Sequence, residues 1–220
     1  LQPLEGQARR LDLGEVRNVS SVSMSKNGEL AFTGSEANRP TELYFMASPA
    51  AAPKRLTNFN DLSRFSLGKT ETVEWRSSDN FLVNGVLTYP PGFDRAKKYP
   101  LVLLLHGGPT ATSTEAFSTL PQLMAARGWI VFQPNYRGSD NIGSAFQRAI
   151  AGDAAEGPGR DVMEGVAAVK KLGFVDERRI AASGWSFGGF MTAWLIGRYP
   201  TEWRAAVAGA APIDIADMYS

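Results

Sequence analysis

Cysteine is absent from this chain of 220 residues, and histidine occurs once, at His106. Without cysteine there are no disulfides, thiolate nucleophiles or cysteine-ligated zinc sites, and one histidine excludes a metal centre built on several. No apolar run approaches the roughly 18–20 residues that cross a bilayer. The chain also has no large excess of positive or negative charge, because it contains 23 Lys and Arg and 22 Asp and Glu. We therefore expect no metal ion or other cofactor, and neither nucleic acid nor a membrane as a partner.

The first part of the chain, residues 1–65, has the pattern of β-structure. Four strand-like runs occupy it, at 19–24, 30–33, 42–46 and 54–57. Asn27-Gly28 lies between the first two runs and is the strongest short signal for a hairpin. Four short antiparallel strands within about 40–45 residues are the size of one propeller blade. We predict the last blade of a β-propeller at 1–65, with a small β-meander as the alternative.

From residue 66 to residue 220 the pattern changes to alternating strands and helices. A hairpin is predicted around the polar turn at 77–80, and Pro90-Pro91-Gly92 ends it. Further strands are predicted at 101–105, 129–132, 180–183 and 205–210, and helices at 117–127, 160–172 and 188–199. This alternation is typical of an α/β fold, with a mostly parallel sheet covered by helices on both faces.

One motif in the α/β region carries a candidate nucleophile. Gly184-Trp185-Ser186-Phe187-Gly188 fits G-x-S-x-G and lies between a predicted strand and a predicted helix. In that context the serine occupies a tight turn at the carboxyl edge of the sheet, and the glycines allow the backbone to crowd around it. The hydroxyl of Ser186 then projects into solvent near the positive end of the following helix. The sequence therefore predicts Ser186 as a nucleophile.

A second motif, His106-Gly107-Gly108-Pro109, follows the predicted strand at 101–105. Acyl transfer develops an oxyanion, which preorganised N–H groups stabilise. One donor is expected to be the N–H of Phe187, and the other that of Gly107 or Gly108. A simple glycine turn after a strand is the alternative. Two such motifs on loops at one sheet edge favour a serine hydrolase.

The general base is the missing part of this machinery. In α/β-hydrolases the order along the chain is serine, then acid, then histidine. The one histidine, His106, precedes Ser186 and lies in the predicted oxyanion loop, so we expect it to hold that loop rather than to act as the base. The chain thus contains a nucleophile and an oxyanion site but no credible acid or base.

Aromatic and charged side chains near the motifs leave alternatives open. Tyr136, Trp185 and Phe190 either line a substrate pocket or pack beneath the nucleophile. Arg137 either clamps a substrate carboxylate or pairs with Asp153 or Asp161, and its fork of donors favours the ion pair.

Several stretches together resemble the prolyl oligopeptidase family of serine peptidases, in particular its acylaminoacyl peptidase and dipeptidyl peptidase branches. They are the two motifs above with their flanks, Asn135-Tyr136-Arg137-Gly138-Ser139, Tyr89-Pro90-Pro91-Gly92-Phe93 and the β-rich stretch before residue 66. The resemblance implies a β-propeller before an α/β-hydrolase domain, with short peptides held between them. It implies Ser186 as the nucleophile, with Gly108 and Phe187 as oxyanion donors. The family's acid and histidine would lie beyond residue 220, so we expect the remainder of a longer protein to supply them.

The resulting prediction is a serine peptidase that hydrolyses short peptides through an acyl-enzyme on Ser186. An esterase on the same fold shares every motif, and the missing base also allows a catalytically incomplete binding or scaffold chain. Lack of cysteine and of a signal peptide favours the cytoplasm, and a homo-oligomer is compatible with the sequence. A sheet that stops after 205–210 would expose an edge and an apolar face, so we expect the 220 residues to aggregate or to bind a hydrophobic dye.

Overall fold

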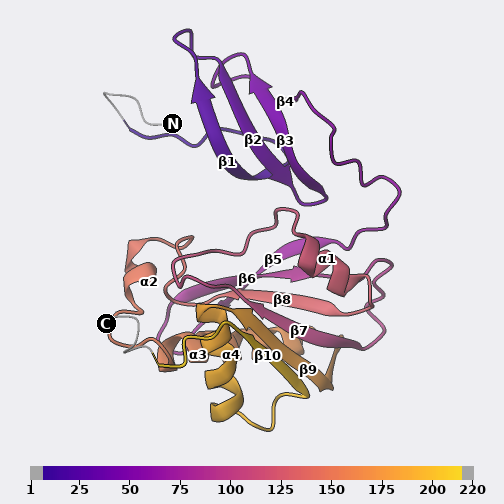
Figure 1. Cartoon of the computed structure of the whole chain (residues 1–220), viewed down its shortest axis with the longest axis vertical. Coiled ribbons are helices and arrows are strands. Elements are labelled where there is room, and N and C mark those ends of the chain that lie inside the picture. The colour runs from indigo at the N-terminus through magenta and orange to yellow at the C-terminus, as the bar shows by residue number, and fades with distance from the viewer. Residues whose placement is uncertain (1–6, 215–220) are drawn as a thin grey trace. The chain divides into compact units, whose positions relative to one another are not determined.

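The computed structural model describes residues 7–214, which form two compact units (Figure 1). The four-stranded unit comprises the chain up to Ser66 together with Glu115–Ser118, and the α/β unit comprises Leu67–Thr114 and the chain from Thr119 onward. Within the described residues, no helix is long and apolar enough to cross a membrane.

The four-stranded unit is an antiparallel sheet in the order β1-β2-β3-β4. Its strands are β1 (Val16–Met24), β2 (Leu30–Glu36), β3 (Arg39–Met46) and β4 (Lys54–Arg55). The predicted hairpin joins β1 to β2, and Gly28 adopts the positive φ of 84° that its turn requires. Phe32 and Tyr44 stack at 5.4 Å between ring centroids in a small core with Leu30 and Met46. Four short antiparallel strands therefore form, as the sequence predicts.

Glu42 ties the segment after β4 to the middle of β3. Its carboxylate is 2% exposed. It accepts hydrogen bonds from the hydroxyl of Thr57 and from the backbone amides of Phe59 (3.2 Å) and Asn60 (2.9 Å). Burial raises the pKa of Glu42, but these donors outweigh burial and hold it below its ordinary value of 4.5.

The α/β unit contains a sheet in the order β10-β9-β7-β8-β6-β5. Its strands are β5 (Thr70–Arg76), β6 (Leu82–Thr88), β7 (Tyr99–Leu105), β8 (Ile130–Asn135), β9 (Val175–Trp185) and β10 (Ala205–Gly209). β5 and β6 form the predicted hairpin, and β6 runs antiparallel to β8. β8, β7, β9 and β10 are mutually parallel, so their carboxyl ends share one edge. The mostly parallel sheet is therefore confirmed.

Helices cover both faces of this sheet, as predicted. They are α1 (Thr119–Ala125), α2 (Ser144–Arg148), α3 (Glu156–Lys171) and α4 (Phe187–Arg198). Because side chains alternate along a strand, Leu101 and Leu103 face the main core beneath α3 and α4, whereas Val102 faces the opposite side, where α1 packs on β6 and β8. The short helix α2 was not predicted.

The face that carries α1 is only partly covered. A groove of about 460 Å³ runs there along β7, β9 and the edge strand β10. Val102, Met124, Trp129 and Val207 contribute to its apolar lining, and Val207 is 65% exposed. The expected exposure of an edge and an apolar face at this end of the sheet is thus present in the described residues.

Candidate active site

Ser186 occupies the turn between β9 and α4. It is exposed and has φ 56° and ψ −123°, a conformation that costs a residue other than glycine about 1–3 kcal/mol. Its backbone holds it in place, because its N–H donates to the carbonyl of Gly209 (3.0 Å) and its carbonyl accepts from the N–H of Phe190 (3.0 Å). This is the strand–serine–helix turn that the motif predicts.

The glycines on either side of Ser186 are required by close approaches. A Cβ atom on Gly184 would lie 2.2 Å from the carbonyl oxygen of Gly188. A Cβ atom on Gly188 would lie 2.1 Å from the carbonyl oxygen of Leu105, at the end of β7. The ends of β7 and β9 and the start of α4 therefore meet with no space for a methyl group.

The groups around the serine hydroxyl match an acyl-transfer site without its base. Within residues 7–214, no hydrogen bond joins the Ser186 Oγ to another side chain. The N–H of Phe187 is the first of α4 and has no acceptor within the helix, so it is free to donate to an oxyanion.

The glycine loop after β7 lies against this turn. A Cβ atom on Gly107 would be 3.4 Å from the Cβ and 3.9 Å from the Oγ of Ser186. Gly108 has φ 117°, which a side chain would strain, and precedes Pro109 through a cis peptide bond. The structure brings together Ser186, Phe187 and the glycine loop. Their roles as nucleophile and oxyanion donors remain predictions.

His106 is held within the same loop by three neighbours. Its Nδ1 lies 2.8 Å from the carbonyl oxygen of Gly107, and its Nε2 lies 2.9 Å from the Oγ of Ser139. Its ring stacks on Tyr136 at 4.4 Å between centroids. Burial lowers the pKa of His106 below 6.5, although the Gly107 carbonyl and the charge of Asp140 oppose that change. Both nitrogens are occupied, so His106 holds the loop, as expected, and is not the general base.

The three aromatic candidates have different surroundings. Tyr136 has no exposed surface, and its hydroxyl donates to the carbonyl of His106, so the structure contradicts a pocket-lining role and supports the packing alternative. Phe190 is partly buried against Phe187, with 5.4 Å between ring centroids. Trp185 is 69% exposed beside the serine. Trp185 and Phe190 therefore remain candidates for a pocket wall.

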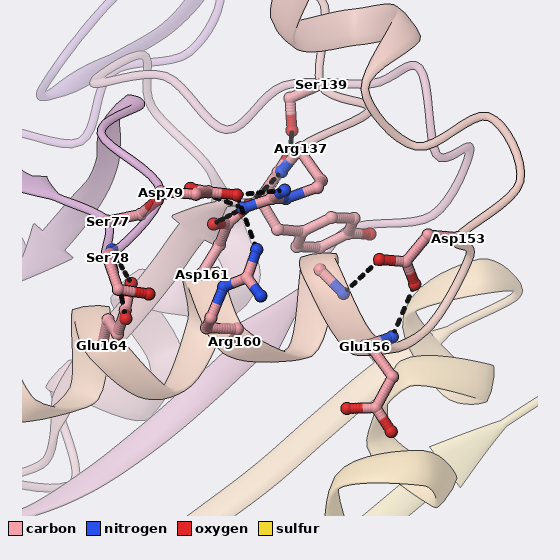
Figure 2. Close-up of polar contacts among 12 residues, drawn as sticks. Ser77, Ser78, Asp79, Arg137, Ser139, Asp153, Glu156, Arg160, Asp161 and Glu164 are labelled. Carbon is pink, nitrogen blue, oxygen red and sulfur yellow. Dashed lines mark hydrogen bonds and ion pairs between the residues drawn. The ribbon is translucent and has the colours of Figure 1, made fainter.

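Arg137 lies at the end of β8 and pairs with carboxylates from two other elements (Figure 2). Its Nε and Nη2 donate to Asp161 of α3 at 2.8 and 2.7 Å, and its backbone N–H donates to the same carboxylate at 2.9 Å. Its Nη1 donates to Asp79 at 2.7 Å. Asp79 also accepts from Arg160 at 2.6 Å. The predicted ion pair with Asp161 is confirmed, whereas sequence reasoning missed Asp79.

The alternative partner, Asp153, has another contact. Its carboxylate accepts from the backbone amides of Glu156 and Gly157, both at 2.9 Å, and so satisfies two free donors at the start of α3 (Figure 2). Of the two partners that the sequence left open for Arg137, the structure has Asp161, because Asp153 bonds the start of α3.

The ionisable side chains of Arg137, Asp79 and Asp161 shift one another's pKa values. Hydrogen bonds from Arg137 lower the pKa of Asp79 well below 3.8. Burial raises the pKa of Asp161, which is completely buried, and the donors of Arg137 oppose that rise. The guanidinium of Arg137 loses hydration by burial, but its two carboxylate partners raise its pKa, so it remains charged. Four of the five N–H donors of the Arg137 guanidinium bond Asp79 and Asp161, so the side chain serves the ion pairs.

Comparisons with known proteins agree with this geometry. Residues 115–220 match the prolyl oligopeptidase family. The chain is 33% identical over 198 residues to the uncharacterized peptidase YuxL of Bacillus subtilis and 32% identical over 185 residues to dipeptidyl-peptidase 5 of Porphyromonas gingivalis. These alignments cover 88% and 82% of this chain but 30% and 27% of those proteins. An acylaminoacyl peptidase of Pyrococcus horikoshii shares the fold, with a TM-score of 0.82 at 23% identity over 94% of this chain and 33% of that chain.

The parallel sheet, the strand–serine–helix turn and the adjoining glycine loop define an α/β-hydrolase. Within that class, the chain belongs to the prolyl oligopeptidase family of serine peptidases. It spans less than a third of the length of the two curated relatives named above.

Proposed function

We propose that Ser186 is the nucleophile of a serine peptidase that hydrolyses short peptides. The observation that carries this proposal is the exposed Ser186 at positive φ, with the free N–H of Phe187 and the Gly107-Gly108 loop beside it. The relatives named dipeptidyl-peptidase 5 and acylaminoacyl peptidase support a peptide bond near a substrate's amino terminus as the point of attack.

In this proposal the Ser186 Oγ attacks the peptide carbonyl as it gives its proton to a histidine. Negative charge on the carbonyl oxygen is stabilised by the N–H groups of Phe187 and Gly108. The amine leaves with that proton, and water then hydrolyses the acyl-enzyme. The histidine and its aspartate partner come from the remainder of the same protein, because His106 is occupied within its loop.

The test is covalent labelling of the full-length protein with a fluorophosphonate, followed by intact-mass measurement. We expect one adduct, which is absent from Ser186→Ala and retained in Ser78→Ala, an exposed serine in the turn between β5 and β6. Folded full-length protein that takes up no probe, or takes it up in Ser186→Ala, would contradict the proposal.

An esterase on the same fold is distinguished by its substrates. Peptide anilides and esters with the same acyl group present the same acyl pocket but different leaving groups. We expect the full-length protein to cleave both, with hydrolysis of the anilide abolished in Ser186→Ala. Cleavage of the esters alone would favour the esterase.

A further inference from the structure

The contacts of His106 determine which of its nitrogens carries a proton. The Gly107 carbonyl, 2.8 Å from Nδ1, can only accept a hydrogen bond, so Nδ1 must be the donor. Burial keeps the imidazole neutral by lowering its pKa, and Nε2 is then an acceptor. The hydroxyl of Ser139, whose Oγ lies 2.9 Å from Nε2, can then donate to it, because the Tyr136 carbonyl, 2.7 Å from that Oγ, also accepts from the backbone N–H of Ser139 at 3.0 Å.

The environment fixes the ring as well as its proton. Ser139 and Tyr136 have no exposed surface, and the Tyr136 ring lies 13° from parallel to the imidazole. The Tyr136 hydroxyl also donates to the His106 carbonyl. The ring, the backbone and the Nε2 atom of His106 are therefore each held by a buried group, which leaves Nδ1 in a defined direction.

The carbonyl that Nδ1 holds belongs to the peptide unit that contains the Gly108 N–H. This peptide bond is trans, so its carbonyl and its N–H point in opposite directions. Holding the Gly107 oxygen on His106 therefore fixes the direction of the Gly108 N–H. Glycines have no side chain to restrain this loop, and Gly107 lies against Ser186.

We propose that His106, held by Ser139 and Tyr136, is a positioning residue that orients the Gly107–Gly108 peptide and aims the Gly108 N–H at the oxyanion formed on Ser186. This proposal rests on the proposed function, and it assigns a role in that reaction to a histidine that is not the base. The ring of His106 contacts Gly107, Ser139 and Tyr136, so in this proposal its effect passes through the Gly107–Gly108 peptide plane.

Two substitutions of similar polarity separate the two ring contacts. In His106→Asn the amide nitrogen can reach the Nδ1 position and donate to Gly107, whereas in His106→Gln it reaches the Nε2 position and Ser139. In the full-length protein we expect kcat to fall about 10–100-fold in His106→Gln, which is less than the 10²–10³-fold loss on removing an oxyanion donor. We expect His106→Asn to stay within about fivefold of wild type, with KM nearly unchanged in both variants.

The result that overturns the proposal is a similar kcat in the two variants, or a change confined to KM. Thermal unfolding of both variants supplies the control, because loss of folded protein would lower the two rates together. If fluorophosphonate labelling shows that Ser186 is inert in the wild-type protein, the proposed function fails. The protonation state of the His106 imidazole then still tests the contact between Nδ1 and the Gly107 carbonyl.

That state is measured by nitrogen-15 solid-state spectra of full-length protein labelled at histidine, with the signals missing from His106→Asn assigned to residue 106. We expect a protonated Nδ1 and an unprotonated Nε2 at neutral pH. A protonated Nε2 with a bare Nδ1 would show that Nδ1 does not hold the Gly107 carbonyl, and the proposal would be wrong.

Discussion

Among residues 7–214, each unit buries one carboxylate, and the two units stabilise it by different means. In the four-stranded unit, Glu42 accepts from a hydroxyl and amides that lie 15–18 residues away in one connecting segment. In the α/β unit, Asp161 accepts from the guanidinium of Arg137, which in turn contacts Asp79 on a third element. The first arrangement lowers the pKa of its carboxyl, whereas the second does not prevent burial from raising it. The difference follows from burial, which opposes ionisation at both carboxyls and is outweighed by the hydrogen-bond donors only at Glu42.

The largest expected effect comes from removing the cation. Arg137→Met leaves Asp161 buried and without its ionic partner, and breaking a buried pair in this way costs about 3–5 kcal/mol. Urea unfolding of the full-length protein should show this loss in the transition of the α/β unit. Arg160→Met is the matched control, because Arg160 is 40% exposed and its bond to Asp79 is worth at most about 1 kcal/mol. Equal losses in the two variants would show that burial of the pair is unimportant.

A smaller loss is expected from Glu42→Gln in the four-stranded unit. The amide removes the charge and replaces one accepting oxygen with a donor that faces other donors, and a hydrogen bond to a charged group is worth about 1.5–3 kcal/mol. Hydrogen exchange should increase in β3 and β4 while β7 and β9 stay protected. Glu29→Gln is the control, since its exposed carboxylate accepts from the side chain of Ser25. Increased exchange throughout both units would show that Glu42 does not stabilise the four-stranded unit alone.

The two units should also lose stability over different pH ranges. His106 has a folded-state pKa below 6.5, so the unfolded chain binds the proton more readily, and stability in the α/β unit should fall as the pH drops from 6.5. Glu42 has a folded-state pKa below 4.5, so its contribution should be lost only as the pH falls below 4.5. Hydrogen exchange as a function of pH reads each unit separately. His106→Asn should make the stability of the α/β unit independent of pH between 6.5 and 4.5. If that stability still changes with pH in the variant, another group titrates in this range.

The smallest change in stability is expected at the edge strands, where both units expose a valine. Val207 on β10 is 65% exposed beside the apolar groove, and Val22 on β1 is 66% exposed. Val207→Lys should reduce the binding of a hydrophobic dye to the 220-residue chain at least twofold, while unfolding free energy changes by less than about 0.5 kcal/mol. Val22→Lys should have the smaller effect on the dye. A larger effect at Val22 would place the main dye-binding surface on the four-stranded unit.

Local patterns predicted most of the fold and the serine turn. Strand alternation, the Asn-Gly turn and the G-x-S-x-G motif each act within a few residues, so the sequence shows them directly. The prediction of a helix at 117–127 was less accurate at its ends and gave no indication of which side chains are buried. The structure begins this helix at Thr119, leaves Leu120 and Leu123 more than half exposed, and buries Gln122 instead. The side chain of Gln122 bonds both backbone groups of Gly68, which no local pattern shows.

Long-range contacts account for what the sequence did not predict at the site. Asp79 accepts a hydrogen bond from Arg137, which lies 58 residues further along the chain. The polar turn around Asp79 does not indicate that partner. Tyr136 follows a strand and resembles a pocket residue, yet packing against His106 buries it completely. In both cases the decisive contact is made only when the sheet brings separate loops to one edge.

The interlocked glycines around Ser186 have a consequence for how this turn evolves. Because Gly184 and Gly188 are restricted by the backbone of neighbouring segments, their selection depends on the folded chain and not on chemistry. A descendant that lost the serine hydroxyl would still need both glycines in order to fold. A duplicated copy that no longer needs the serine would therefore keep both glycines of the motif around a different residue. The two glycines therefore report the fold of this turn, and only the serine bears on the proposed reaction.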